Sequence, residues 1–225
     1  MGTLKVRGIG KVTAEPDYVE IYLTLTARNK DYGAATDEIA DKSGLLEKAV
    51  KAAGFPKKAL ETLSFSVNTE YESVQDEKGI YQRVFAGYTC YSRSVLGFRF
   101  TGERLMKALS AVTSDGISPE LNVTFKVEDP SAVKERLLAA AVANAREKAA
   151  IICREAGVSM GEIRNIDYQF GNSDMVSETR FETDEAAMPM LAMGSAKMRS
   201  MNFAPRSIEM TDSITVEWET EQGGL

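Results

Sequence analysis

The chain has 225 residues, no histidine and a net charge of −6 at pH 7. Histidine exchanges protons near neutrality and is the commonest metal ligand. Its absence therefore excludes His-dependent nucleophile triads and imidazole-based zinc sites. The content of 44% hydrophobic and 27% charged residues is typical of a globular protein. The acidic balance argues against a nucleic-acid surface, which needs clustered Lys and Arg.

The sequence contains no run of about 18 apolar residues, which argues against a membrane-spanning helix. Its start, MGTLKVRGIG, lacks the apolar region of a signal peptide. We expect either a cytoplasmic protein or one whose export signal has been removed. The two cysteines do not decide between these compartments. Cys90 and Cys153 are expected to be buried free thiols rather than a disulfide.

The first elements expected are a short strand over residues 4–13 and a Pro- and Asp-containing turn over 14–17. Residues 19–27 alternate between apolar and polar side chains, which predicts a strand with one face in the core. A helix is expected over residues 31–53, because apolar residues recur there at helical spacing. Gly54 follows it as a helix-ending glycine.

The middle of the chain predicts an extended hairpin arm. Strands are expected over residues 63–71 and 84–100, and residues 76–79 carry a turn signal between them. Thr101 is the expected N-cap of a short helix that runs to about residue 114. A further strand is expected over residues 121–127.

The clearest helix follows, with Asp129 as its expected N-cap and Pro130 at its first position. It runs to Gly157. Its many alanines predict a close approach to a neighbouring sheet or helix. The expected apolar stripe consists of Leu138, Ala141, Ala145, Ala149, Ile152 and Ala156. Strands are then expected over residues 163–170 and 207–220.

Together these elements predict an α+β fold of mixed, largely antiparallel sheets with about three helices packed on them, in the order ββαββαβαββ. We expect residues 1–56 and 129–225 to form a discontinuous frame domain. Residues 57–128 would form an inserted ββαβ subdomain, and residues 172–204 a long Met-rich loop. A helix–Gly–strand unit recurs around Gly54 and Gly157, which indicates either an internal duplication or the common pattern of such connections.

Two groups of residues resemble known sites without their full pattern. Gly8 and Gly10 are not followed by the helix that a nucleotide-binding loop requires. We therefore favour a β-bulge or a close backbone approach. The acidic groups lack the spacing of a calcium loop and are interpreted as solvated surface. These groups are Asp37 with Asp41, and Glu182 with Asp184 and Glu185.

The stretch from residue 171 to 205 holds six of the ten methionines. Met188, Met190 and Met193 are candidate Cu(I) ligands, because thioethers are soft ligands that select this ion. The favoured interpretation is a loop that docks its methionines on the protein's own core or on a neighbouring subunit. Disorder is the next alternative.

The motifs, taken in order, resemble the SIMPL domain family, a group of domains of unknown function that includes oxidative-stress defence and periplasmic immunogenic proteins. The resemblance rests on VRGIGKVTAEPDYVEIYLTL, the helix ending at Gly54, LETLSFSVNTEY, AGY at residues 86–88, AAAVANAREKAAIICREAGVSMGEI and APRSIEMTDSITVEWE. It implies a mixed α+β fold, self-association and a link to envelope or oxidative stress. It implies no catalytic residues.

We therefore expect a non-enzymatic, self-assembling homo-oligomer without a cofactor. The resemblance favours an exported, periplasmic protein, and a cytoplasmic one stays open. We expect neither a nucleic-acid partner nor a transmembrane segment, and the protein ligand stays open. The alternative is a metal- or redox-responsive binder that uses the Met-rich loop and the thiols of Cys90 or Cys153.

Overall fold

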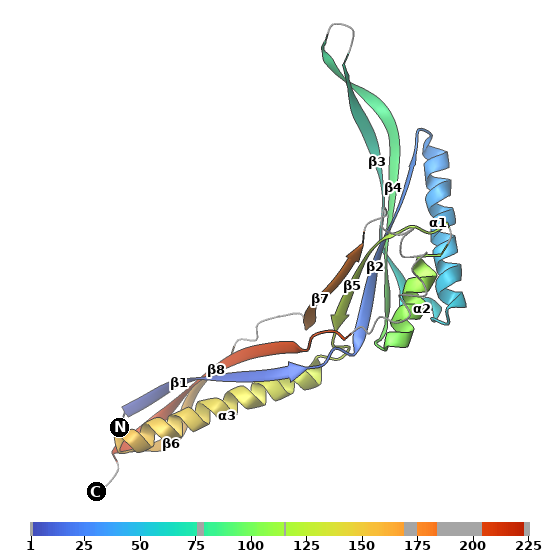
Figure 1. Ribbon diagram of the computed structural model, residues 1–225. Coiled ribbons are helices and arrows are strands. Elements are labelled where there is room, and N and C mark those ends of the chain that lie inside the picture. Colours follow the sequence, from blue (N-terminus) through green and yellow to red (C-terminus); the bar gives the residue numbers. More distant parts are fainter. Residues whose placement is uncertain (1, 76–78, 115, 169–174, 184–203, 223–225) are drawn as a thin grey trace. The chain divides into compact units, whose positions relative to one another are not determined.

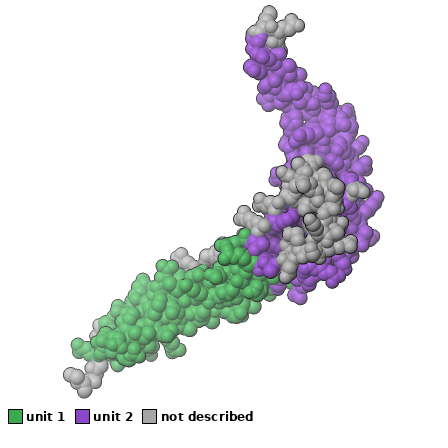
Figure 2. Space-filling view, viewed as in Figure 1, with its two compact units in different colours: residues 1–16, 127–178, 206–225 green, residues 17–126, 179–205 purple. Residues whose placement is uncertain are grey.

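The computed structural model describes residues 2–75, 79–114, 116–168, 175–183 and 204–222 (Figure 1). By their contacts the residues divide into two units, which Figure 2 shows in different colours. Unit 1 consists of residues 1–16, 127–178 and 206–225, and unit 2 of residues 17–126 and 179–205. None of the described helices is both long and apolar enough to cross a membrane.

The boundaries of these units differ from those expected from the sequence, where residues 57–128 were to form the inserted subdomain. Strand β2 (Tyr18–Asn29) pairs with β4 (Tyr81–Arg99) on one side and with β5 (Glu120–Lys126) on the other. Residues 17–56 therefore group with residues 57–126, whereas the expectation placed them with the ends of the chain.

Unit 1 is a three-stranded antiparallel sheet with one long helix on it. The strand order is β1 (Gly2–Ala14), β8 (Ile208–Gln222) and β6 (Val158–Asp167), so the last strand is the central one. Helix α3 (Ser131–Ala156) lies along this sheet (Figure 1). The core between them contains Val6, Ala141, Ala145, Ala149, Ile214, Val216 and Trp218.

Helix α3 and strand β1 touch backbone to backbone. A Cβ atom on Gly8 would lie 2.1 Å from the carbonyl oxygen of Ala141, and one on Gly10 would lie 2.1 Å from that of Leu137. Both distances are far below van der Waals contact, so only glycine fits at the two positions. The close approach predicted from the glycines and from the alanine-rich helix is confirmed.

The ends of α3 follow their expected chemistry with a shift of one residue at the start. Pro130 is the N-cap, and a carboxylate oxygen of Asp129 accepts a hydrogen bond from the backbone N–H of Ser131 at 2.9 Å. Hydrogen bonds from Ser131 lower the pKa of Asp129. Gly157 ends the helix in the left-handed conformation at a φ of 67°.

The expected apolar stripe of α3 is wrong at two positions. Ile152 is 45% exposed and Ala156 is also exposed. The contact with Gly8 and Gly10 fixes which face of α3 meets the sheet. Ile152 and Ala156 lie next to that face and not on it. The buried residues of α3 are Val133, Leu137, Ala141, Ala145, Ala149 and Cys153.

The second sheet has five strands in the order β3-β4-β2-β5-β7, where β3 is Leu60–Gln75 and β7 is Val176–Thr183. It lies in unit 2 except for residues 176–178 of β7, which group with unit 1. Two helices, α1 (Tyr32–Ala52) and α2 (Gly102–Val112), pack on it, and a short 3-10 helix covers Lys57–Ala59. The predicted N-cap of α2 is confirmed, because the hydroxyl of Thr101 accepts a hydrogen bond from the backbone N–H of Arg104 at 3.2 Å.

The predicted faces of β2 and α2 are confirmed. The alternating apolar side chains of β2 are at most 2% exposed: Val19, Ile21, Leu23, Leu25 and Ala27. On α2 the buried residues are Leu105, Ala108, Leu109 and Val112. These side chains form one core with the inner face of α1. The α+β class predicted from the sequence is therefore correct.

Two expected connections differ from the structure. Residues 172–204 are not a loop throughout, because β7 lies within them and Met175 is buried. The fold has this one strand more than the expected order. Residues 15–17 join strands of different sheets, since β1 pairs with β8 and β2 with β4 and β5.

Candidate interaction surface on the hairpin arm

The hairpin predicted from the sequence is present. Strands β3 and β4 pair antiparallel from Leu60 and Leu96 to Gln75 and Tyr81. Strand β2 pairs with β4 only as far as the pair of Asn29 and Tyr88. Beyond that pair the sheet narrows to a two-stranded ribbon, which extends past the end of β2 in Figure 1. We call this ribbon, residues 70–75 and 79–87, the distal arm.

Gly87 fixes the base of the distal arm. Its φ is +147°, and a Cβ atom there would lie 2.7 Å from the carbonyl oxygen of Asn29. The register of β3 and β4 shifts at the same place, between Glu70 and Tyr71. A bulge of this kind bends and twists the strand that carries it. The arm therefore leaves the sheet at a defined point.

Aromatic rings form a continuous row from α1 onto the distal arm. Tyr32 contacts Tyr88 edge to face with ring centroids 5.4 Å apart, and Tyr88 contacts Phe85 at 5.2 Å. Phe85 contacts Tyr71 at 6.2 Å, and the guanidinium of Arg83 lies 4.6 Å from the centre of the Tyr71 ring. Aromatic and cation–π contacts of this kind hold side chains in place at a surface.

The distal arm exposes large apolar side chains on both strands and at its end. Each is between 43% and 70% exposed: Tyr71, Val74, Ile80, Tyr81, Val84 and Phe85. Within the described residues no other element covers them. The register places Tyr71, Phe85 and Tyr81 on one face of the ribbon and Val74 and Val84 on the other. An isolated two-stranded hairpin is marginally stable in water, and exposed apolar side chains gathered on one element mark an interaction site. The distal arm is therefore the candidate functional site.

A hollow of about 700 Å³ lies at the base of the distal arm. Its lining includes the cationic side chains of Arg28 and Lys30, the carboxylate of Glu70 and the buried Thr89. Among the described residues the hydroxyl of Thr89 is the one buried side-chain polar atom without a hydrogen-bond partner. This hydroxyl is closed to solvent, so it offers no contact to a ligand in the hollow.

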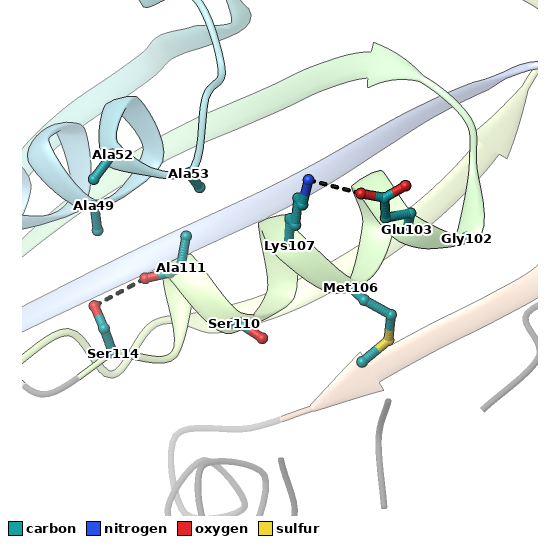
Figure 3. Close-up of a pocket in the computed structure, with 10 residues that line it drawn as sticks. All are labelled: Ala49, Ala52, Ala53, Gly102, Glu103, Met106, Lys107, Ser110, Ala111 and Ser114. Atoms are coloured by element: carbon teal, nitrogen blue, oxygen red, sulfur yellow. Dashed lines mark hydrogen bonds and ion pairs between the residues drawn. The ribbon is translucent and has the colours of Figure 1, made fainter. Parts of the chain in front are cut away.

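A second hollow of about 980 Å³ lies between α1 and α2 (Figure 3). Alanines of both helices line it together with Met106 and Ser110. At its rim Lys107 forms an ion pair with Glu103 at 2.7 Å, and this contact lowers the pKa of Glu103. The pair joins successive turns on the exposed side of α2. It is an ordinary surface pair, and the other residues that line the hollow are alanines, serines, Gly102 and Met106.

The candidate copper ligands Met188, Met190 and Met193 lie outside the described residues. Met175, from the same Met-rich stretch, is 5% exposed and packs with Ile208 and Met210 in the core of unit 1. Among the described residues no group of three or more acidic or Cys side chains could hold a metal ion.

The two acidic groups form no binding site among the residues that the structure describes. Asp37 and Asp41 are exposed on α1, as their interpretation as solvated surface predicts. Of the other acidic group, Glu182 lies in β7, but its side chain falls outside the described ones, as do Asp184 and Glu185.

Both cysteines are buried free thiols, as predicted: Cys90 is 0% exposed and Cys153 is 3% exposed. Burial, together with the nearby charge of Glu38, raises the pKa of the Cys90 thiol. Because burial keeps reagents away from both sulfur atoms, and because the thiolate is the reactive form, which the raised pKa of Cys90 disfavours, we expect neither cysteine to react quickly with a maleimide while the protein is folded. Counting labelled thiols by mass spectrometry with and without urea checks this. Rapid labelling of native Cys90 would contradict the buried thiol.

Comparisons with known proteins give one consistent result. The SIMPL family, described as "protein of unknown function", matches residues 4–218. The 26 kDa periplasmic immunogenic protein of Brucella melitensis biotype 1 is 24% identical over 189 residues, which cover 83% of this chain and 75% of the relative. The protein of the same name from Brucella abortus shows the same identity and coverage. The chain therefore belongs to the SIMPL family.

Proposed function

We propose that this SIMPL protein is a non-enzymatic, self-assembling protein whose copies associate through the distal arm. The observation that carries the proposal is the two-stranded ribbon with six large apolar side chains that nothing described covers. Burying such side chains against a second copy would stabilise the assembly by removing apolar surface from water. It would also support a hairpin that is too narrow to bury them itself.

The composition of the distal arm fits a protein interface. Aromatic residues and arginine are enriched at such interfaces, and Tyr residues are frequent energetic centres. The row from Tyr88 through Phe85 to Tyr71 and Arg83 presents these groups in fixed positions before any partner binds. A surface that is already ordered loses less side-chain entropy on association.

The test is the oligomeric state of the protein with and without the apolar side chains of the arm. We expect the unchanged protein to be oligomeric at micromolar concentration by native mass spectrometry and light scattering. A variant that combines Tyr81→Ser, Val84→Thr and Phe85→Ser is expected to be monomeric with an unchanged far-ultraviolet circular dichroism spectrum.

Val142→Thr with Ile151→Gln is the matched control, because these residues of α3 are 43% and 44% exposed but lie outside the arm. This control is expected to stay oligomeric. If the unchanged protein is monomeric at micromolar concentration, the proposal is wrong. If the arm variant assembles as well as the control, the distal arm is not the interface between copies.

The proposal includes the periplasm as the place of action and a role in envelope or oxidative stress. The compartment is supported by the name of the Brucella relatives, which are called periplasmic proteins. The role in stress stays a prediction from the resemblance. Deleting the gene and measuring survival in peroxide would test it, since unchanged survival would count against the role.

The alternative function, a metal- or redox-responsive binder, also stays a prediction. It depends on Met188, Met190 and Met193, which lie outside the described residues. A Cu(I) titration of the unchanged protein and of a variant with all three methionines replaced by leucine tests it. Equal binding by both proteins would exclude these residues as ligands.

A further inference from the structure

Strand β3 has the longest open edge of the described fold. Among the described residues it pairs only with β4, and its residues 61–75 make no backbone hydrogen bond on the other side. The edge of β1 is closed by α3, because the backbone N–H of Ile9 donates to Oδ1 of Asn144 at 3.0 Å. The ammonium of Lys148 also donates to the carbonyl oxygen of Arg7 at 3.1 Å. The edge strands β6 and β7 have only 10 and 8 residues, against 16 in β3.

The edge of β3 lacks the usual protection against another strand. It contains neither proline nor lysine, the residues that commonly protect an edge strand. Residues 68–75 are all exposed. This part of β3 runs into the distal arm, where the sheet has only two strands (Figure 1). A third strand along the edge would supply the pairing that an isolated hairpin lacks.

The two faces of β3 differ in character from residue 64 onwards. The register shift at Glu70 adds Ala86 to β4, so β3 itself keeps its regular alternation. Its odd-numbered residues lie on the face that carries the row of aromatic rings, and two of them, Phe65 and Tyr71, are 55% and 48% exposed. The opposite face begins with five polar residues: Ser64, Ser66, Asn68, Glu70 and Glu72.

The sequence of β3 is self-complementary in one register. Two copies that use the same edge are related by a two-fold axis, so the paired strands run antiparallel. A pair centred on residue 70, 71 or 72 would place a glutamate opposite a glutamate, which destabilises paired strands. A pair centred on Asn68 places Phe65 opposite Tyr71 on both sides of the axis. No other centre brings these two rings together, and aromatic pairs stabilise neighbouring strands.

We propose that two copies pair antiparallel through their β3 edges, with Asn68 on the two-fold axis and Phe65 of each copy opposite Tyr71 of the other. This inference rests on the proposed self-assembly and names the contact that produces it. Residues 70–75 of the distal arm gain a third strand, which consists of residues 61–66 of the second copy. The contact is closed, because both copies use the same edge.

Single cysteines on the polar face of β3 test this register. Asn68→Cys places two thiols directly opposite each other, where the Cα atoms of paired strands are about 4.5–5.5 Å apart and a disulfide fits. We expect oxidised glutathione to convert most of this variant into a disulfide-linked dimer. Ser66→Cys and Glu70→Cys are expected to stay largely unlinked, since their thiols are offset by four residues, about 13 Å, between the two copies.

An equal mixture of Ser66→Cys and Glu70→Cys is expected to form the linked dimer again, because residue 66 of one copy lies opposite residue 70 of the other. The unchanged protein is the control, since its own cysteines, Cys90 and Cys153, are both buried. Peptide mass spectrometry after non-reducing electrophoresis identifies which cysteines are joined. Circular dichroism verifies that each variant is folded.

A charge at residue 66 tests the same register without a covalent bond. Ser66→Glu would face Glu70 twice in each dimer, and we expect its association to weaken about fivefold or more. Ser66→Lys would face the same glutamates and is expected to associate at least as tightly as the unchanged protein. Ser110→Glu, on the exposed side of α2, is the control and is expected to leave association unchanged. Analytical ultracentrifugation measures all four proteins.

The outcomes separate this inference from the proposal beneath it. If the unchanged protein is monomeric at micromolar concentration, both are wrong. If it assembles but Asn68→Cys gives no linked dimer, or Ser66→Cys and Glu70→Cys each link as readily alone, only the β3 register is wrong. Weakening by Ser66→Lys would also contradict the register. Linkage at residue 68 and in the mixture, with the expected order of affinities, supports it.

Discussion

Gly10→Ala is expected to destabilise the protein by about 3 kcal/mol or more, because overpacking of a filled interior costs on the order of 1–3 kcal/mol even where side chains can yield. Here the added methyl group would meet backbone: the carbonyl oxygen of Leu137 at 2.1 Å and the amide nitrogen of Ala141 at 2.8 Å. Relief requires α3 to move away from β1, which opens the core of unit 1. Urea unfolding followed by circular dichroism measures the loss.

Gly44→Ala is the matched control for this substitution. Gly44 lies inside α1, and nothing stands within 4 Å of the position that its Cβ would take. Alanine in a helix is more favourable than glycine by about 0.5–1 kcal/mol, so this variant is expected to gain stability. A Gly10→Ala protein as stable as the unchanged one would contradict the backbone contact between α3 and β1.

Trp218→Ala is expected to cost about 3–5 kcal/mol, the usual range for removing a large buried aromatic side chain. Trp218 is 4% exposed, and most of its neighbours in the core of unit 1 are small, among them Ala141, Ala145 and Ala149. Alanines cannot extend into the cavity that the indole would leave. The free energy of unfolding in urea measures this cost, with circular dichroism as the probe because the only tryptophan is lost.

Trp218→Phe is the control, since it keeps an aromatic ring in the same place and is expected to cost less. Hydrogen exchange then locates the damage. We expect faster exchange in α3 and β8 of the Trp218→Ala protein and little change in β2, whose core belongs to the other cluster. A cost below about 1 kcal/mol would show that the indole does not fill the core of unit 1.

The parts of the fold that depend on local periodicity could be predicted from the sequence. The alternation from Val19 to Ala27 reports burial directly, because successive side chains of a strand face opposite sides. The same holds for α2 at helical spacing. Gly8 and Gly10 were also informative, since two missing side chains on one face of a strand require something close above them.

Features that depend on distant partners could not be predicted in this way. Ile163 and Ile166 have the pattern of core residues, but each is 54% exposed on the edge strand β6. Strand β7 is short and mostly polar, so nothing in its own sequence distinguishes it from a loop. The division of the chain between residues 16 and 17 follows from the partners of β2, which lie more than fifty residues further along the chain.

The candidate site also has one part that could be predicted from the sequence and one part that could not. Alternation and a turn signal predict the hairpin, and the structure confirms its pairing. That Tyr71, Val84 and Phe85 remain exposed could not be predicted, because an alternating strand has the same sequence pattern whether or not another layer covers it.

The central position of β8 in unit 1 has a consequence for the order of events during synthesis. Strand β1 cannot pair with its only described partner, β8, until nearly the whole chain has been synthesised. Strands β2, β4 and β5, by contrast, pair with one another and all lie within residues 17–126. At ribosomal rates of about 5–20 residues per second, unit 1 would be completed roughly 5–20 s after the main part of unit 2. During that interval the glycine face of β1 has no sheet to join. A neighbouring nascent chain that offers its own β8 would produce a domain-swapped pair.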